Sequence, residues 1–487
     1  MMKTIRFLSM AALVLVGAIT IGCSSDDDSN VQPPTQPETS KRVTLTTTIS
    51  LDGSATTRAL TSEGEKTFAE GDRIAVVYTN KSNMRVTAVS NALQKSDITN
   101  NNKNARISVT LDDPVAGSVD YIYPAAMAND DGTINYSALC MQDGTLQTLA
   151  AKLDCAKGSG NMTVSGNEYV LPANVSLQNM LAVCKFKIKN SGGTEITNSI
   201  TGLTISDGTN TYTVSRTTAT DNDPIYVALQ PVTSDKTISL VAIAGNASGS
   251  YYKSVSNKAL DAGDMVPVNV TMTQGRIIDL STLTADCEAQ HGDILINKLM
   301  DSYKVSVAAG ATVILHNASI NYDTTPVLSG AFAGITCLGS ATLVVSGNED
   351  FVKGLGSGYP GIFVPSGSTL TVTGSGTLYA LGQEYGAGIG SGLYNINDYK
   401  DCGNIVIQGG TIWATGGGSA AGIGSGASII FTQYDTGTPS TCGNITIKSS
   451  VTQVYATAGS GAESIGKGQY SDCSAITIED LNKVTLQ

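Results

Sequence analysis

The sequence predicts an all-β protein in which two β-sandwiches are followed by a parallel β-helix. Only 14% of the residues are charged, and 52 glycines accompany many threonines, serines and asparagines, which favours short strands and turns over long helices. Up to about residue 272, short alternating apolar segments are separated by turn residues. After Gln274, two short motifs recur at intervals of about 30 residues, which is typical of a repeat architecture.

Residues 1–22 have the features of an export signal. Lys3 and Arg6 give a positive start, and residues 7–21 form an apolar segment too short for a stable membrane span. The ending resembles a bacterial lipobox, which implies that Cys23 carries acyl chains and anchors the mature protein to the outer membrane. The acidic residues 26–28 resemble the surface-export signal of some lipoproteins of Gram-negative anaerobes. The alternative is an ordinary signal peptide with an incidental cysteine.

Residues 23–40 are polar and rich in proline, so we expect a disordered tether. From residue 41 the pattern alternates, with Val43, Leu45, Thr47 and Ile49 on one side of an extended segment. In the N-terminal sandwich, residues 41–170, the other predicted strands are 73–78, 106–111 and 119–123.

The C-terminal sandwich is predicted over residues 171–274, after a boundary near residues 165–175. Its predicted strands are 182–188, 211–215, 237–243 and 265–272. Turn-forming clusters separate these segments and no amphipathic helical stretch intervenes, which favours sandwiches over a mixed fold.

Five motifs in this region, taken in their order, resemble the fimbrillin family. They are Thr57-Arg58-Ala59, Phe68 to Ile74, Tyr121 to Ala125, Leu181 to Ile188 and Leu260 to Val266. The resemblance covers about residues 41–273. It implies a pilus subunit with two transthyretin-like β-sandwiches, delivered to the cell surface as a lipoprotein.

The resemblance also implies a mechanism of assembly. In fimbrillins a trypsin-like protease cuts after an arginine beyond the first strand, and a strand of the next subunit fills the groove that opens. Here 43–51 would be the removable strand and Arg58–Ala59 the scissile bond. The alternative is that Arg58 is one more exposed arginine.

Residues 275–487 contain two interleaved series of short motifs. The first series comprises Val313, Leu343, Leu370, Ile405, Ile445 and Ile476, and the second comprises Ile335, Ile362, Ile389, Ile423 and Ile465. The intervals between successive members change in the same way along both series, which indicates one repeating coil. We therefore predict a parallel β-helix with a central column of aliphatic side chains. The glycine-rich segments 386–392 and 420–426 are better explained as tight corners than as phosphate loops, because no Lys-Ser/Thr follows and a strand–helix context is lacking.

Insertions between the repeats supply the candidate ligand-binding residues. They carry aromatic and acidic side chains that suit sugar rings: Tyr394, Asp398, Tyr399, Asp401, Tyr434 and Asp435. The alternative is that the tyrosines merely cover the edge of the coil. Trp413, the single tryptophan, is expected to be structural.

Cysteines occupy equivalent places in three repeats, at Cys402, Cys442 and Cys473. Neighbouring repeats would bring two of them within disulfide reach, and an unpaired stack fits equally well. A zinc site is improbable, and no cofactor or metal is predicted, because the chain has no CxxC pair and only two histidines, His291 and His316.

The resemblance, together with the repeats that follow it, implies a surface-exposed cell-adhesion protein, a tip or accessory subunit of a type V pilus. Its partners would be other pilus subunits, through strand addition, and a host or microbial glycan or protein bound by the β-helix. Nucleic acid is excluded as a partner, because the net charge of −12 would repel phosphates. Donation of a final sandwich strand is doubtful, because over two hundred residues follow Gln274.

The alternative is a surface-tethered β-helix polysaccharide lyase or hydrolase. Such an enzyme needs clustered carboxylates or a basic residue on one exposed face. In this chain the acidic residues occur singly in variable loops, so we predict a protein that is not an enzyme.

Overall fold

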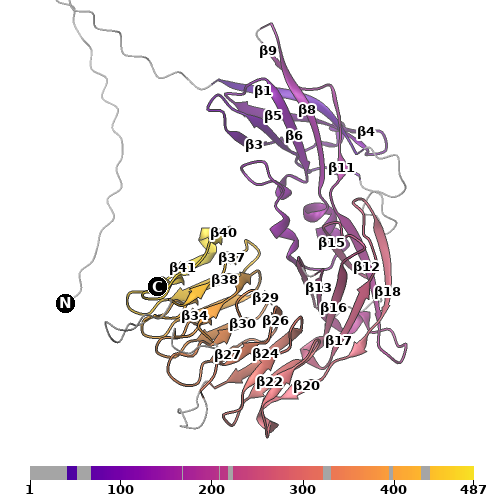
Figure 1. The fold of residues 1–487 in the computed structure, drawn as a ribbon. Helices are drawn as coiled ribbons and strands as arrows, with labels where there is room; N and C mark the ends of the chain where they lie inside the picture. The colour runs from indigo at the N-terminus through magenta and orange to yellow at the C-terminus, as the bar shows by residue number, and fades with distance from the viewer. Residues whose placement is uncertain are drawn as a thin grey trace, which may run out of the picture. The chain divides into compact units, whose positions relative to one another are not determined.

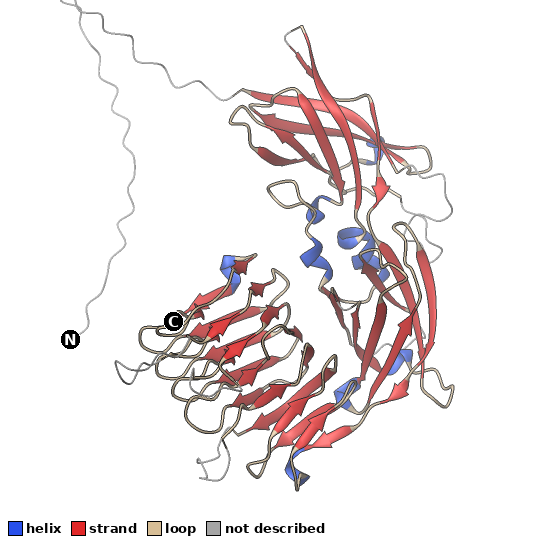
Figure 2. Cartoon of the chain, viewed as in Figure 1, coloured by secondary structure: helices blue, strands red, loops and turns tan. Residues whose placement is uncertain are grey.

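The computed structural model describes residues 41–51, 67–166, 168–207, 209–217, 223–321, 331–393, 399–428 and 439–487. Strands dominate these residues, as Figures 1 and 2 show, and the α-helix that they contain, α1 (Leu146–Thr148), is a single turn. The predicted all-β class is therefore confirmed. None of the helices in the described part of the chain has the length and apolar character needed to cross a bilayer.

The first pair of sheets contains the strand that opens the described chain. One sheet has the order β10-β1-β5-β4, and the other has the order β11-β8-β6-β2-β3, with β9 paired to β8. The bounds are β1 (Arg42–Ser50), β2 (Ala75–Thr79), β3 (Arg85–Val89), β4 (Ile98–Thr99), β5 (Asn104–Asp112), β6 (Gly117–Tyr123), β8 (Ala156–Ser165), β9 (Glu168–Val170), β10 (Asn174–Ser176) and β11 (Gln178–Asn179). Both sheets contribute to one core, in which Ile49, Ile107 and Tyr121 are fully buried.

The second pair of sheets follows the same plan. A sheet of order β15-β12-β18 faces a sheet of order β19-β17-β16-β13-β14-β7 across a shared core. The bounds are β7 (Met141–Gln142), β12 (Ala182–Lys189), β13 (Ile200–Ser206), β14 (Thr211–Ser215), β15 (Ile225–Leu229), β16 (Thr237–Ala244), β17 (Ser250–Ser256), β18 (Met265–Thr271) and β19 (Thr273–Gln274). The strands predicted in this region agree with the observed ones to within one or two residues. The two pairs of sheets are not divided at a single point of the chain. β7 joins the second pair, although β10 and β11, which follow it in the chain, join the first.

From Ile277 to Leu486 the described strands pair in parallel with strands about one repeat further along the chain. One sheet contains β20 (Ile277–Asp279), β22 (Ile294–Lys298), β24 (Thr312–Ile320), β26 (Ala341–Val345), β27 (Asp350–Lys353), β29 (Thr369–Gly374), β30 (Thr377–Leu381), β33 (Asn404–Ile407), β34 (Thr411–Thr415), β37 (Ile445–Ile447), β38 (Gln453–Thr457), β40 (Ile476–Ile478) and β41 (Val484–Leu486). A second sheet contains β21 (Cys287–Ala289), β23 (Val305–Val307), β25 (Ile335–Cys337), β28 (Ile362–Phe363), β31 (Ile389–Gly390), β35 (Ile423–Gly424) and β39 (Ile465–Gly466). A short third sheet pairs β32 (Asp401–Cys402) with β36 (Thr441–Cys442).

The register of these parallel ladders agrees with most of the predicted repeat. The predicted isoleucine series is aligned from Ile335 to Ile465, one residue per strand. In the other series Leu343 pairs with Val372, and the expected pairing with Leu370 is wrong by two residues. A shift of two keeps every side chain on its own face of the sheet, because strand faces alternate with a period of two.

The ladders enclose a column of aliphatic side chains. Ile335, Leu343, Ile405 and Ile445 are fully buried within one continuous cluster. Each such side chain contributes about 1.5–3 kcal/mol through burial of apolar surface. A smaller cluster joins the second pair of sheets to the first parallel strands, and its members are Val241, Ile243, Ala247, Ile294, Ile314 and Val344.

Candidate functional site

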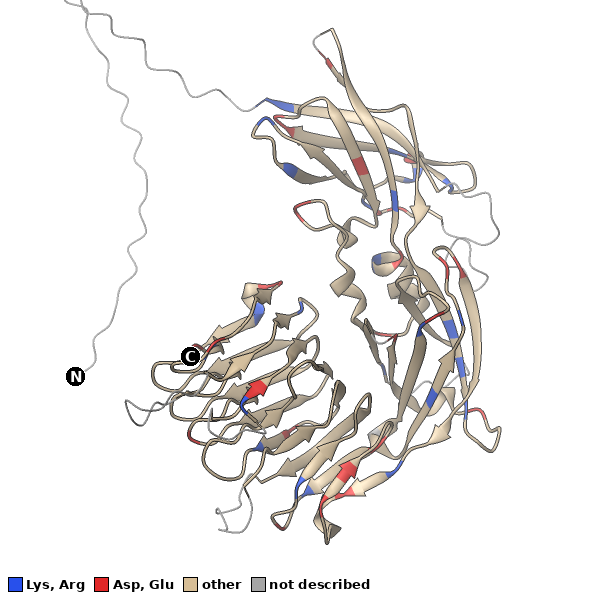
Figure 3. Ribbon diagram, viewed as in Figure 1, with Lys and Arg blue, Asp and Glu red and all other residues tan. Residues whose placement is uncertain are grey.

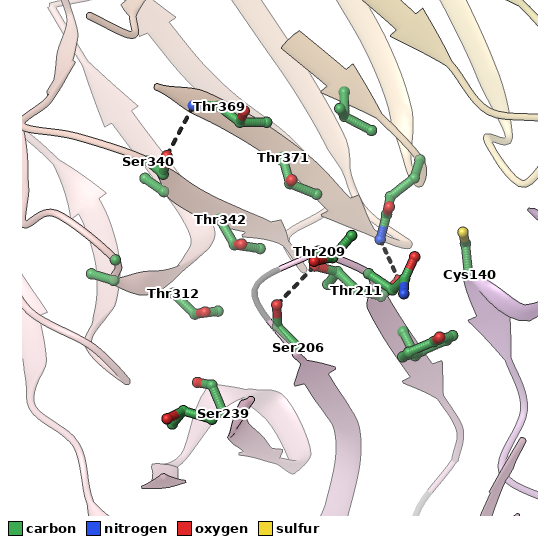
Figure 4. A pocket seen from close by; sticks show the side chains of 18 of the residues that line it. Cys140, Ser206, Thr209, Thr211, Ser239, Thr312, Ser340, Thr342, Thr369 and Thr371 are labelled. Atoms are coloured by element: carbon green, nitrogen blue, oxygen red, sulfur yellow. Dashed lines mark hydrogen bonds between the residues drawn. The ribbon is translucent and has the colours of Figure 1, made fainter. Parts of the chain in front are cut away.

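A cleft of about 970 Å³ lies where the second pair of sheets meets the first parallel strands. One wall is the outer face of β24, β26, β29, β33 and β37. The other is built from the segment between β13 and β14, from β16 and β17, and from residues 136–140 (Figure 4). We call this space the hydroxyl cleft, because most of its lining side chains are threonines, serines and tyrosines.

A row of threonines forms the first wall of the hydroxyl cleft. Thr312 pairs in register with Thr342, which pairs with Thr371; the next position is Val406, followed by Thr446. Their strand neighbours point into the aliphatic column, so the threonine side chains point outward into the cleft (Figure 4). Parallel pairing spaces these side chains at about 4.8 Å.

Several of these hydroxyls are available to a ligand. The side chains of Thr342, Thr371 and Thr446 are half-buried and make no hydrogen bond to any described residue. Nearby, the Ser340 hydroxyl accepts from the Thr369 amide at 3.0 Å, so its own proton can still be donated. The row therefore offers both donors and acceptors.

Direct contacts hold the back of the hydroxyl cleft together. Gln408 Nε2 donates to the Thr211 carbonyl at 2.9 Å, and the hydroxyls of Thr213 and Thr373 lie 2.8 Å apart. The Thr211 hydroxyl donates to Ser206 Oγ at 3.3 Å. Because both partners of the first two bonds are buried, these bonds fix the distance between the two walls.

The hydroxyl cleft is nearly free of charge. Its lining residues, as far as the structure describes them, include no aspartate, glutamate or arginine. The lysine that they include, Lys448, forms an ion pair with Glu479 at 2.8 Å. Figure 3 likewise shows few charged residues along the parallel strands. The arrangement therefore suits a neutral ligand that forms many hydrogen bonds.

A serine–histidine pair inside the cleft has the spacing of a catalytic dyad. His291 Nε2 lies 3.1 Å from Ser239 Oγ, but the Thr312 amide donates to His291 Nδ1 at 3.1 Å. Burial lowers the pKa of His291, so the ring is neutral, and Nδ1 must be its unprotonated nitrogen. The proton is then on Nε2, which donates to Ser239 and cannot accept the serine proton. The pair connects β16 to the parallel strands instead of activating a nucleophile.

Most residues predicted to be functional lie outside the described residues. These are Cys23, Arg58, Ala59, Tyr394, Asp398, Tyr434 and Asp435. Tyr399 is described and is only 7% exposed; its ring contacts Tyr359 and Phe363, and its hydroxyl lies 3.3 Å from Thr336 Oγ1. In this arrangement Tyr399 is buried and belongs to the same cluster as the aliphatic column.

Asp401 has a structural partner on the next repeat. Its Oδ1 accepts from the Thr441 amide at 3.0 Å and from the Thr441 hydroxyl at 2.9 Å, beside the β32–β36 pairing. These bonds hold two successive repeats in register.

The equivalent cysteines form a stack. Cys402 pairs in register with Cys442, and their sulfur atoms are 2.7 Å apart. Cys473 lies beyond Cys442, and its sulfur donates to the Gly443 carbonyl at 3.7 Å. The thiol contact with Cys402 raises the pKa of Cys442. No group of three or more His, Cys, Asp or Glu side chains in the described ranges is arranged to hold a metal ion.

A column of aromatic side chains lies on another outer face of the same sheet. Phe351, Tyr379, Trp413 and Tyr455 occupy paired positions on β27, β30, β34 and β38. Neighbouring rings are nearly parallel, with centroids 4.6, 6.0 and 3.7 Å apart. The inner ring faces are directed at one another, which leaves mainly ring edges for a ligand. Stacking of sugars needs open faces, so the column is structural.

We therefore expect Trp413→Ala to destabilise the chain by about 2 kcal/mol, because two stacked aromatic pairs of about 1 kcal/mol each are lost. Trp413→Phe should lose less than half as much, since it keeps a ring between Tyr379 and Tyr455. Thermal unfolding of the three proteins measures both effects. Equal losses in the two variants would contradict the stacking account.

No protein-family model matches the sequence, and a comparison with curated proteins gave no match. Among solved structures, similar chains include a candidate cell adhesion protein from Bacteroides fragilis NCTC 9343 (12% identity, TM-score 0.29, covering 46% of this chain and 88% of that one). A second is a fimbrial assembly protein from Parabacteroides distasonis ATCC 8503 (13% identity, TM-score 0.27, covering 48% of this chain and 93% of that one). A third is a candidate cell adhesion protein from Bacteroides ovatus ATCC 8483 (12% identity, TM-score 0.29, covering 49% of this chain and 96% of that one).

Proposed function

We propose that this protein is a surface-exposed, fimbrillin-like cell-adhesion subunit, a tip or accessory component of a type V pilus. In this proposal residues 41–170 and 171–274 are transthyretin-like β-sandwiches, and residues 275–487 are a parallel β-helix that binds a glycan or protein. Cys23 delivers the chain to the outer membrane through its lipid.

The position of β1 is the observation that carries this proposal. β1 pairs along all nine residues with β5 and, at its end, with β10, so it fills the space between two other strands. Leu45, Thr47 and Ile49 alternate into the core, and the Thr47 hydroxyl donates to the Pro172 carbonyl. Removing β1 would leave an edge on β5, an edge on β10 and an apolar groove between them. An incoming strand with the same alternation could refill such a groove.

In this proposal a protease site follows β1 and its cleavage releases this strand. Arg58 follows β1 by eight residues, outside the described residues, in a threonine-containing segment that resembles the fimbrillin cleavage site. Cleavage there would separate β1 from the rest of the chain while leaving every other described strand intact. A groove of this kind would accept a strand from a neighbouring subunit.

The tip or accessory role rests on the continuation of the chain beyond the second pair of sheets. β19 ends at Gln274, and the parallel strands begin at Ile277, so the last strand of this pair continues directly into the next region. A strand connected at both ends cannot extend freely into a neighbouring subunit. This subunit would accept a strand without donating one.

Arg58→Ala is expected to abolish processing. The natural chain recovered from the cell surface should begin at Ala59, whereas the variant should keep Cys23 and migrate with a higher apparent mass. Arg42→Ala is the matched control, because Arg42 is exposed and lies in the segment to be removed. N-terminal sequencing and electrophoresis of the surface protein measure the outcome. The same apparent mass for the natural chain and the Arg58 variant would overturn strand removal.

A further inference from the structure

We propose that the hydroxyl cleft is the ligand site of the protein and that it binds a neutral oligosaccharide along the threonine row. This inference rests on the proposed adhesive function and makes it more specific, because it moves the site from the inserted loops to the wall formed by β24, β26, β29, β33 and β37. It also names one class of ligand.

The size of the cleft favours an oligosaccharide over a single sugar. Its volume of about 970 Å³ is at the upper end of the range for small-molecule sites. The threonine row crosses several successive strands from Thr312 to Thr446, so its hydroxyls are spread along a line. An extended sugar chain presents hydroxyl groups at a similar repeat, so it can contact Thr342, Thr371 and, beyond Val406, Thr446.

The chemistry of the lining favours a neutral sugar. A uronic acid or a sialylated or sulfated glycan would bring negative charges into a space without an available cation, since Lys448 is already paired with Glu479. Desolvating such charges without partners is costly. Thr342, Thr371 and Thr446 instead offer unpaired hydroxyls, which match the hydroxyls of a neutral sugar.

A peptide strand is a poorer occupant of this cleft. Peptides that add to a sheet bind through backbone hydrogen bonds at an open edge. The wall with the threonine row is a sheet face, and its backbone groups are already used between β24, β26, β29 and β33. Only side chains are available there, which suits a ligand recognised through its own hydroxyl groups.

The test uses the full-length protein on a glycan array that contains neutral, sialylated, sulfated and uronic-acid oligosaccharides. The best neutral glycan is then titrated by calorimetry against the natural chain and against the double variant Thr342→Val/Thr371→Val. Valine keeps the branched shape while removing two hydroxyls that have no described partner, so the fold should be retained. We expect binding at least about tenfold weaker, because two hydrogen bonds are lost.

The matched control is Thr377→Val/Thr411→Val. These threonines also form a registered pair on neighbouring strands of the same sheet, are also half-buried, and lie outside the cleft. The control should bind like the natural chain. Equal affinity of the cleft variant and the natural chain would place the glycan elsewhere and overturn the site.

Binding of acidic glycans alone, or of none, would overturn the ligand class. Neither result would decide the fimbrial assignment, because processing at Arg58 tests that assignment separately. Failure of the site and failure of the proposed function are therefore distinguishable.

Discussion

Raising the pH from 4 to 8 is expected to lower the free energy of unfolding of the natural chain by roughly 4 kcal/mol, because Asp350 loses its proton. Asp350→Asn is expected to remove this loss. Asp350 is fully buried, and burial raises its pKa to about 7. Its Oδ1 accepts from the Ala318 amide at 2.8 Å, while Oδ2 has no hydrogen-bond partner among the described residues. Burial is the largest influence on this pKa and outweighs the backbone amides of Ala318, Gly347 and Asn317, which lower it.

The sign follows from proton binding. The ordinary pKa of 3.8 applies to Asp350 in the unfolded chain, so between pH 4 and pH 7 the folded chain holds the proton more tightly. Stability falls with rising pH wherever the folded state binds more protons. The loss begins near pH 4, grows up to about pH 7 and is complete above it. Asparagine cannot ionise and should show no such loss.

The measurement is the thermal unfolding midpoint of the natural chain and the variant at pH 4 and pH 8. The difference between the two unfolding midpoints should shift by about 4 °C in favour of Asp350→Asn as the pH rises. Glu349→Gln removes a carboxylate from the exposed neighbouring position and serves as the control, in which we expect little change. A pH-independent difference for Asp350→Asn would show that burial does not control this carboxyl group.

The sequence predicted the parallel ladders well because inward positions are chemically uniform. Every member of the series from Ile335 to Ile465 is an isoleucine beside a glycine or a serine, so the register of these strands can be read directly from the sequence. The pairing of Leu343 with Val372 was missed, because both Leu370 and Val372 satisfy the same period of two. A periodic pattern fixes which face a residue occupies, but it cannot by itself choose between registers that differ by two.

A third series of strands escaped prediction for a different reason. Its outward positions are Phe351, Tyr379, Trp413 and Tyr455, and the inward ones include Val352, Leu378 and Ala380. The residue types vary from strand to strand, so no constant motif marks the repeat. What the members share is aromatic stacking, which becomes apparent only once the strands are aligned.

Only one of the two walls of the hydroxyl cleft could be predicted from the sequence. Threonines open the repeats at Thr312 and Thr342, and alternation places them opposite the buried side chains, so a hydroxyl row could have been predicted. The opposite wall could not, because Ser206, Thr211 and Ser239 come from strands well before the repeats. Their approach depends on the cluster around Ile243 and Ile314, which is a tertiary contact.

Three glycines at the corners of the parallel ladders share a positive φ, and two of them, Gly390 and Gly424, also have a packing that other residues cannot share. Gly390, Gly424 and Gly466 end β31, β35 and β39 with φ values of +145°, +142° and +135°. A Cβ on Gly424 would lie 1.8 Å from the Gly466 carbonyl oxygen, and a Cβ on Gly390 would meet the Gly424 oxygen in the same way. Because the obstructing atoms are backbone, no side-chain rotation can relieve the contact. This repeated close approach is the physical reason for the two similar glycine-rich segments.

Gly424→Ala is therefore expected to destabilise the chain by at least about 3 kcal/mol, since it combines a left-handed backbone with a clash against the next repeat. The matched control is Gly367→Ala, because Gly367 also has a positive φ, +78°, but nothing lies within 4 Å of its Cβ position. The control should lose only about 1 kcal/mol, the cost of the backbone conformation alone. Thermal unfolding of both variants separates the cost of the backbone conformation from the cost of the clash with the next repeat. Similar losses would mean that the ladder can spread at Gly424 to admit a methyl group, and the close packing of successive repeats would then not explain these glycines.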